Sequence, residues 1–375
     1  MSFFYFLYFG VLGLYIPYFN LYCRELGFSG FQIGILLILQ PLSRLLFPVL
    51  WGLYADRFGR RDRLIKISYG IAAVTFGLLI FIRRFPLFAV VLWIYTFFIV
   101  PVLPLWEAAV LERLKVLKRD YGPVRTWGSL GFITFSLLGG FLMDRWPTRI
   151  MLWVMVVISV VNVFQYSRVK VDGYTSLILK RLDFSWLKSR KLIVFLVPCA
   201  LIHASHGSYY GYFSIFMRAA GHSNQYIGFL WTLGVLSEVG VLFFSGRLLR
   251  RWGHGRLFGL ALLGTSLRWL FSAMIYSGPL FMLIQLLHGL SFGLFHVCSI
   301  TRIQELVPSH YRSTAQSLYS SAAYGLGGLA GFLMNGFLYD SWGMIRLWVI
   351  DGILAAAALG IFLFSHSKSK VNPIY

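Results

Sequence analysis

The chain has 375 residues, of which 58% are hydrophobic and only 13% are charged, with a formal net charge of +21. Its mean hydropathy of +0.73 and its recurring apolar segments of about 20 residues exclude an ordinary soluble domain and predict membrane-spanning helices. No basic segment precedes the first apolar stretch, so we expect a retained span there rather than a cleaved signal.

The apolar segments predict an all-α membrane protein with twelve transmembrane helices. In chain order these cover residues 2–22, 31–55, 64–83, 87–111, 125–143, 149–167, 191–217, 225–246, 257–276, 279–303, 314–338 and 344–366. The first six define an N-terminal bundle over 1–167. The last six define a C-terminal bundle with a short cytoplasmic tail over 191–375, and the basic segment 168–190 is the predicted cytoplasmic linker.

Residues 13–59 recur without a gap at residues 207–253, at an offset of 194. Arg24 and Gly27, for example, return as Arg218 and Gly221. Parallel repeats of this size build two-bundle secondary transporters, which hold substrate between the bundles near the bilayer midplane. The duplication therefore predicts two six-helix bundles related by a pseudo-twofold axis.

The positive charge follows the predicted topology. If the N-terminus is cytoplasmic, most of the 34 lysines and arginines fall in alternate loops on the cytoplasmic side. This positive-inside bias predicts an integral protein of the bacterial inner membrane with both termini in the cytoplasm, and it removes the need for a nucleic-acid partner. The three cysteines lack metal-site spacing, so neither a metal nor a cofactor is expected.

Arg44, Glu238 and Arg268 lie within predicted spans, where an ion costs about 2.5 to 3.5 kcal/mol on insertion scales. Arg44 and Glu238 occupy equivalent repeat positions in helices 2 and 8, and Arg268 lies in helix 9. We expect all three to line the central cavity, with Glu238 as the nearest counter-charge of Arg268 in at least one state. The alternative is a fixed structural ion pair without a role in transport.

Two polar and aromatic stripes carry the histidines of helices 7 and 10. Their members are His203, His206, Tyr209 and Tyr210 in the first stripe, and His288, Ser291, Phe292 and His296 in the second. Such imidazoles could carry a proton or bind substrate, whereas the alternative is neutral histidines that hydrogen-bond between helices. A metal is disfavoured because His288 and His296 are about 12 Å apart along a helix, with no carboxylate nearby.

Prolines bend the helix predicted at 87–111, and glycines let the helix at 125–143 approach a neighbour closely. These residues are Pro101, Pro104, Gly128 and Gly131. Glu107 and Arg125 could then form a pair, unless both extend toward the cytoplasmic interface as long polar side chains do.

The segment Gly52-Leu53-Tyr54-Ala55-Asp56-Arg57-Phe58-Gly59-Arg60-Arg61 resembles the signature loop between helices 2 and 3 of the major facilitator superfamily. The resemblance implies a gating loop that latches the cytoplasmic ends of the bundles. In its second copy, residues 246–255, Arg250 replaces the aspartate, so the resemblance does not extend a latch to that half.

Within that superfamily, two segments resemble the phenylpropionate-permease-like group and, more distantly, lactose permease. They are Pro104-Leu105-Trp106-Glu107-Ala108 and Tyr121-Gly122-Pro123-Val124-Arg125-Thr126-Trp127-Gly128-Ser129. Further matches are Ser205-His206, Tyr209-Tyr210-Gly211, Leu233-Gly234-Val235 with Glu238, Arg268-Trp269, and Leu287-His288 with Phe292 and His296. In lactose permease the Glu and Arg that match Glu107 and Arg125 belong to the sugar site.

Ser291 stands where lactose permease carries a proton-coupling carboxylate, so coupling requires another group. Glu238 and Glu107 are the candidates, and we favour Glu238 because a carboxylate in a dry cavity is neutralised more easily than one near the rim.

The sequence thus predicts a proton-coupled symporter of a small organic solute, such as an aromatic carboxylate, that works by alternating access as a monomer in the lipid bilayer. Arg44, Arg125 or Arg268 would neutralise the substrate carboxylate. Aromatic residues would stack on its ring, namely Trp106, Tyr209, Tyr210 and Phe292. A sugar or nucleoside symporter that uses Glu107 and Arg125 is the alternative. A receptor or membrane-embedded enzyme is a remote one, since the chain has no HExxH, Walker or GxSxG motif.

Overall fold

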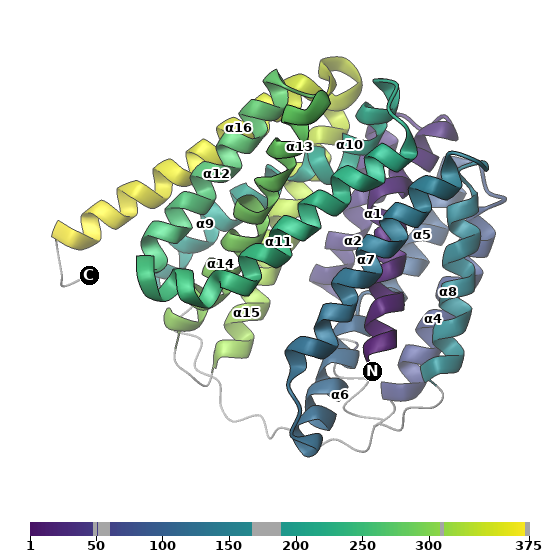
Figure 1. Ribbon diagram of the computed structural model, residues 1–375, viewed down its shortest axis with the longest axis horizontal. Helices are drawn as coiled ribbons and strands as arrows, with labels where there is room; N and C mark the ends of the chain where they lie inside the picture. The colour runs from purple at the N-terminus through teal and green to yellow at the C-terminus, as the bar shows by residue number, and fades with distance from the viewer. Residues whose placement is uncertain (48–50, 52–60, 167–188, 308–310, 372–375) are drawn as a thin grey trace. The chain divides into compact units, whose positions relative to one another are not determined.

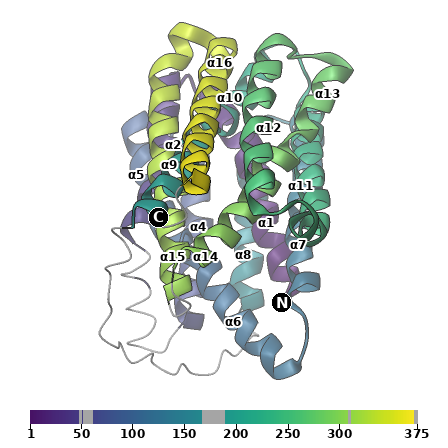
Figure 2. The same ribbon diagram turned by 90° about the vertical axis from the view of Figure 1, so that its left-hand side faces the viewer.

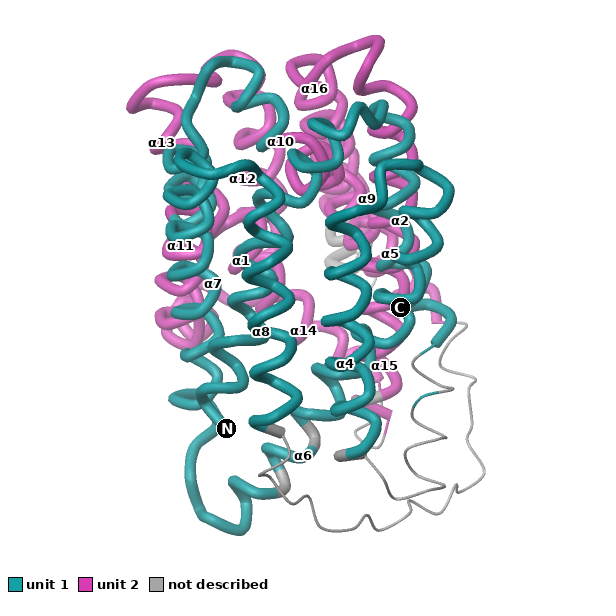
Figure 3. Tube along the Cα trace, turned by 90° about the vertical axis from the view of Figure 1, so that its right-hand side faces the viewer, with its two compact units in different colours: residues 1–179, 214–232 teal, residues 180–213, 233–375 magenta. Residues whose placement is uncertain are grey.

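The computed structural model describes residues 1–47, 51, 61–166, 189–307 and 311–371, and these residues form helices and no β-strand. They divide into two compact units, which Figure 3 shows in different colours. Unit 1 comprises the described parts of Met1–Leu179 together with Ser214–Thr232, and unit 2 the described parts of Lys180–Phe213 together with Leu233–Tyr375. The predicted all-helical architecture is confirmed for these residues.

Unit 1 is built on two pairs of long helices, α1 against α7 and α4 against α8 (Figure 1). Its helices are α1 Ser2–Glu25, α2 Gly30–Leu46, α4 Arg61–Leu79, α5 Phe85–Ile99, α6 Val102–Leu117, α7 Tyr121–Met143 and α8 Ile150–Tyr166. The predicted bend in the fourth span is confirmed, since α5 ends before Val100 and Pro101 and α6 begins after them.

Unit 2 pairs α12 with α16 and α16 with α9, and α12 and α16 run side by side in Figure 2. Its helices are α9 Arg190–Ala204, α12 His254–Met274, α13 Gly278–Leu286, the π-helix η2 Gly289–Leu294, α14 Phe295–Glu305, α15 Arg312–Ser320, the π-helix η4 Ser321–Gly327 and α16 Gly328–Val371. Two helices, α10 Gly207–Ala219 and α11 Asn224–Trp252, have residues in both units. Within α16 the chain turns at Gly343, whose φ is +72°.

Glycines allow the closest helix contacts, as the sequence predicted. A Cβ at Gly131 of α7 would overlap the backbone of Phe6 in α1. In unit 2, a Cβ at Gly327 or Gly331 would collide with the backbone of Ala200 or Ala204 in α9. Small residues permit such backbone approach in membrane helices, where packing replaces the hydrophobic effect as the source of association.

The sequence repeat is confirmed as a repeat of local structure. Gly27 and Gly221 both adopt a left-handed backbone, with φ of +87° and +88°, a conformation that favours glycine. Each is preceded by an arginine whose guanidinium donates to a carbonyl four residues later. Arg24 Nη1 lies 3.2 Å from the oxygen of Phe28, and Arg218 Nη1 lies 3.3 Å from the oxygen of His222.

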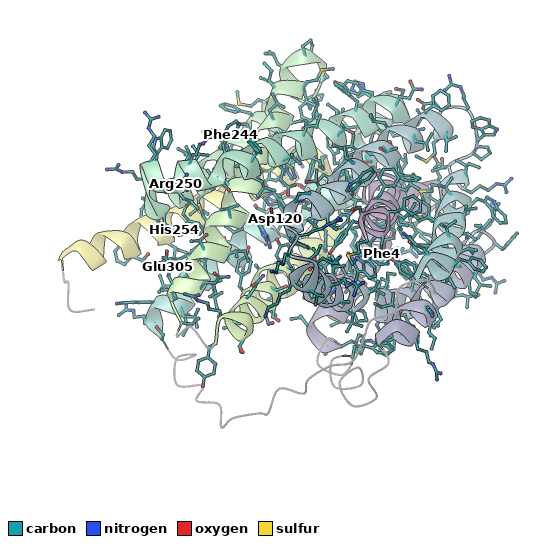
Figure 4. The ribbon with its side chains drawn as sticks, turned by 60° about the horizontal axis from the view of Figure 1, so that its bottom comes forward. Phe4, Asp120, Phe244, Arg250, His254 and Glu305 are labelled. Carbon is teal, nitrogen blue, oxygen red and sulfur yellow. The ribbon has the colours of Figure 1, made fainter. Side chains whose placement is uncertain are left out.

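The second copy of the signature loop lies within the described residues. Only Gly253, with φ of +72°, separates α11 from α12. His254 Nε2 donates to the carbonyl oxygen of Cys298 at 2.6 Å, which ties α12 to α14. Glu305 lies near His254 at the same end of unit 2, and Figure 4 labels both together with Arg250. The second copy thus has Arg250 at the position of the aspartate and, four residues later, a histidine that joins α12 to α14.

Eight helical runs among the described residues are long and apolar enough to cross a membrane. Many large apolar side chains are exposed, including Phe81 at 73%, Phe243 at 80% and Met274 at 75%. Soluble monomers rarely expose so many large apolar side chains, and such a surface suits contact with lipid. The protein is an integral membrane protein.

Candidate functional site

Arg268 is the centre of a buried polar cluster in unit 2. Its side chain is 0% exposed. Nη1 donates to His288 Nδ1 at 2.8 Å and to the Ser291 hydroxyl at 3.1 Å, and Nη2 donates to Gln285 Oε1 at 3.2 Å. Because the guanidinium must donate, His288 Nδ1 is an acceptor and the ring proton lies on Nε2, so His288 is neutral here. All three partners of the cation are therefore uncharged.

Two aromatic rings complete this group, which we call the arginine cluster: Arg268, Gln285, His288, Ser291, Tyr209 and Trp269. The Arg268 Cζ atom lies 4.4 Å from the ring centroids of both Tyr209 and Trp269. Cation–π contacts contribute about 2 kcal/mol or more when they are desolvated. The Nε–H of Arg268 has no hydrogen-bond acceptor among the described residues. The cluster therefore holds a buried cation whose Nε–H group is available to a ligand.

A π-helix places the second predicted stripe. His288 directly precedes η2, and Phe292 lies inside it. The rings of His288 and Phe292 are stacked at 5.4 Å, and those of Phe292 and His296 at 6.1 Å, so the predicted stripe is confirmed. A Cβ at Gly289 would lie 2.7 Å from the carbonyl oxygen of Ser237, so glycine lets α11 pack directly on the π-helix. Such π-bulges are frequent at functional sites.

The first predicted stripe lies at a break in the helix rather than on a continuous face. The hydroxyl of Ser205 and Nδ1 of His206 both donate to the carbonyl oxygen of Ile202, at 2.8 and 2.7 Å. The backbone N–H of His206 instead donates to His203, and α9 ends at Ala204. Side chains that compete for backbone acceptors interrupt a helix in this way.

The break turns His206 toward the arginine cluster. Its ring lies 5.0 Å from the ring of Trp269 and 6.5 Å from that of His288. Since Nδ1 donates, Nε2 is an acceptor, and it has no partner among the described residues. Tyr210 stacks on His206 at 6.0 Å.

Glu238 lies on α11, half-buried, with its backbone against the π-helix at Gly293. The hydroxyl of Tyr210 experiences the charges of both Glu238 and Arg268. The described hydrogen bonds of Arg268 go to other groups, so the expectation that Glu238 is its counter-charge stays a prediction.

His296, at the far end of its stripe, contacts a residue that the sequence did not single out. Its Nδ1 lies 3.1 Å from the hydroxyl of Tyr324, which belongs to the second π-helix, η4. The ring of His203 lies 4.0 Å from the same tyrosine. Nothing in a single sequence marks Tyr324, because its position depends on how η4 meets α14.

Unit 1 holds a second group, the tyrosine cluster: Tyr5, Tyr8, Glu107, Tyr121 and Arg125. Tyr121 donates to Glu107 Oε1 at 2.9 Å, and its hydroxyl also contacts that of Tyr5 at 3.5 Å. Arg125 lies over the ring of Phe9 at 4.0 Å and that of Tyr5 at 5.9 Å. Glu107 and Arg125 therefore meet the same tyrosines, although no ion pair joins them among the described residues.

Arg44 lies exposed on α2. The charges of Arg44, Glu107 and Arg125 all act on the Tyr8 hydroxyl, so the structure brings the three predicted residues of this half together around one tyrosine. Trp106, a predicted stacking residue, is 1% exposed and packs on Phe4 at 4.1 Å, as a core residue does.

The predicted gating loop lies outside the described residues. Its members are Gly52, Asp56, Arg57, Gly59 and Arg60. No group of three or more His, Cys, Asp or Glu side chains that could hold a metal is found in the described part of the chain. Sequence reasoning also missed Gln285, a neutral residue that only its contact with Arg268 makes conspicuous.

The long apolar helices, the duplicated turn and the buried polar clusters are typical of a membrane transporter. The chain belongs to the MFS_1 like family, whose model matches residues 1–350. This match confirms the resemblance to the major facilitator superfamily.

Among similar proteins, the "Probable 3-phenylpropionic acid transporter" of Escherichia coli strain K12 is 28% identical, with 92% of this chain and 92% of that protein covered. The maltose permease of Geobacillus stearothermophilus is 26% identical over 98% of this chain and 94% of its own length. The crystal structure of the nucleoside transporter NupG superposes with a TM-score of 0.84 at 20% identity, covering 96% of this chain and 98% of that one. These relatives are transporters and not enzymes, so this chain is a transporter, as predicted.

Proposed function

We propose that this protein is a proton-coupled symporter that takes up a small aromatic carboxylate by alternating access. The observation that carries the proposal is the arginine cluster. Arg268 is a fully buried cation whose described hydrogen-bond partners are all neutral, and it lies against two aromatic rings. Guanidinium groups bind carboxylates through charge-assisted hydrogen bonds.

The features of the substrate follow from those of the cluster. The free Nε–H of Arg268 would donate to the carboxylate, and Tyr209 and Trp269 would face an apolar ring. The likeness to a probable 3-phenylpropionic acid transporter, at 28% identity, supports this class of substrate.

The finer architecture belongs to the same proposal. We propose twelve spans in two six-helix bundles related by a pseudo-twofold, with residues 168–190 as the linker. The eight long runs, of which Thr314–Ser365 spans 52 residues and holds two predicted helices, and the shorter apolar helices Gly30–Leu46 and Ile150–Gln165 support eleven of these spans. The helix α4 Arg61–Leu79 lies at the position of the remaining one. We further propose a bacterial inner-membrane location, cytoplasmic termini and a monomeric working unit.

The test is uptake by the purified protein in proteoliposomes with an imposed pH gradient, alkaline inside. Labelled 3-phenylpropionate should accumulate only with the gradient, and unlabelled 3-phenylpropionate should compete with it. The uncharged 3-phenylpropionamide should compete roughly 10 to 150 times more weakly, because hydrogen bonds to charged groups are worth about 1.5 to 3 kcal/mol.

Arg268→Gln should abolish this preference for the acid over the amide. Equal competition by acid and amide in the unmodified protein would contradict the proposal, and so would a retained preference in the variant.

A sugar or nucleoside symporter is the second candidate, and the tyrosine cluster favours it. Glu107 is a half-buried carboxylate with a tyrosine donor, and Arg125 lies beside the same tyrosines. Carboxylate and guanidinium groups bind sugar hydroxyls well, and relatives include a maltose permease. Uptake of labelled maltose or uridine, competed by neither phenylpropionate nor its amide, would support this reading instead.

A further inference from the structure

Unit 2 contains a fully buried carboxylate that the proposed substrate site does not use. Asp351 lies in α16 and is 0% exposed. One of its oxygens, Oδ2, accepts a hydrogen bond from the hydroxyl of Ser208 in α10, which is also 0% exposed. The other oxygen, Oδ1, has no hydrogen-bond partner among the described residues.

This environment suits a protonated carboxyl group better than an anion. A buried carboxylate is stable only when a cation or several donors compensate it. Asp351 has one neutral donor and an oxygen left over, and no cation is among its described contacts. A metal ion would need several oxygens around it, whereas the hydroxyl and the carboxyl oxygen already contact each other directly.

Titratable groups lie on the helices around Asp351, but their described contacts go elsewhere. On α12, Arg268 faces His288, Ser291 and Gln285. On α9, His203 faces Tyr324, and on α10 Tyr212 stacks on Tyr339 at 4.4 Å. His206, Tyr209 and Tyr210 contact one another and the arginine cluster. No other titratable side chain is therefore among the described contacts of the Asp351 carboxyl group.

Two short connections join Asp351 to the arginine cluster. Ser208 is followed directly by Tyr209, whose ring centroid lies 4.4 Å from the Arg268 guanidinium. Gly352, the residue after Asp351, accepts a hydrogen bond at its carbonyl from the hydroxyl of Ser266 at 2.9 Å, and Ser266 is two residues before Arg268 on α12. A change of charge at Asp351 thus acts on α10, which carries Tyr209, and on α12, which carries Arg268.

We propose that Asp351, held by Ser208, is the binding site of the coupling proton. The carboxylate takes up one proton from one side of the membrane to become a neutral acid, and it releases that proton to the other side. This inference rests on the proposed symport. Burial was the criterion that selected Glu238 from the sequence, but Glu238 is only half-buried whereas Asp351 is fully buried.

The experiment compares Asp351→Asn with Glu238→Gln in proteoliposomes. Both substitutions keep size and polarity and remove the titratable group. Exchange of labelled 3-phenylpropionate without a gradient reports binding and alternation. Accumulation driven by an alkaline interior, together with substrate-dependent proton flux, reports coupling.

We expect D351N to retain exchange within about threefold and to lose at least about tenfold in accumulation and proton flux, as removal of a coupling group requires. E238Q should keep both. Accumulation by D351N at the level of the unmodified protein overturns the proposal, and so does loss of coupling in E238Q alone. A lack of gradient-driven uptake in the unmodified protein would instead refute the symport itself.

A second variant keeps the test decisive if D351N does not fold. Ser208→Ala leaves the carboxyl in place and removes its donor, so the anion is less stabilised and the proton is held to higher pH. The pH of half-maximal uptake should move upward by about 0.5 to 1 unit, the equivalent of one hydrogen bond. An unchanged pH profile in S208A would overturn the proposal.

Discussion

Replacing Arg268 by lysine separates the shape of the guanidinium from its charge. The arginine uses two nitrogens, Nη1 toward His288 and Ser291 and Nη2 toward Gln285, at 2.8 to 3.2 Å. A lysine has one nitrogen and cannot occupy both positions. At least one buried acceptor then loses its donor, which costs about 1 to 3 kcal/mol.

The contact with the two aromatic rings weakens as well, because a compact ammonium cannot stack on both. Tyr209 and Trp269 each lie 4.4 Å from the guanidinium carbon, and an exposed cation–π contact alone is worth about 0.5 to 1 kcal/mol. We therefore expect R268K to raise the apparent Kd for 3-phenylpropionate roughly 10- to 700-fold, since each 1.4 kcal/mol is a factor of ten.

The assays are substrate binding in detergent and substrate exchange in proteoliposomes. Arg302→Lys is the matched control. Arg302 pairs with Glu305 at 2.9 Å, with side chains 43% and 48% exposed, and such surface pairs contribute about 0 to 1 kcal/mol. R302K should therefore leave the apparent Kd nearly unchanged. If R268K and R302K bind substrate equally well, the forked geometry of Arg268 has no role in recognition and the reasoning fails.

Two further variants test the packing of unit 1 and its tyrosine cluster. Gly131→Ala should lower the melting temperature in detergent, because its methyl group would overlap the backbone of Phe6 and overpacking costs about 1 to 3 kcal/mol. Gly77→Ala, with no atom within 4 Å of the added carbon, should raise it by the helix preference of about 0.5 to 1 kcal/mol; equal shifts would contradict the assigned helix contact. Tyr121→Phe removes the donor to Glu107 at 2.9 Å and should change 3-phenylpropionate uptake by less than about threefold. A larger loss in the uptake assay would mean that the tyrosine cluster, rather than the arginine cluster, binds the carboxylate.

The two clusters differ in how far the sequence could predict them. His288, Phe292 and His296 were placed on one stripe by their spacing, and their rings stack in the structure. His203 and His206 were also placed together, but on a continuous helix. That helix is broken because the Ser205 and His206 side chains take the Ile202 carbonyl, a competition that spacing does not reveal.

Asp351 shows a limit of a different kind. A lone carboxylate in a predicted span is a functional candidate by the cost of burying it, and that signal was present in the sequence. What the sequence could not provide is the comparison between carboxylates. Burial of Asp351 and Glu238 depends on which neighbours face each helix, and only the fold decides that.

The sequence by itself determined the class of protein: hydropathy required membrane helices, the repeat predicted a turn whose local structure occurs twice, and the loop motifs indicated the superfamily. These properties are local or periodic along the chain, so they survive without coordinates. The tertiary structure alone decided which side chains meet. Neutral partners around Arg268, a hydroxyl on Asp351 and tyrosines between Glu107 and Arg125 arise from contacts between different helices. Hydrogen bonds and burial act over a few ångströms in space, whatever the separation along the chain.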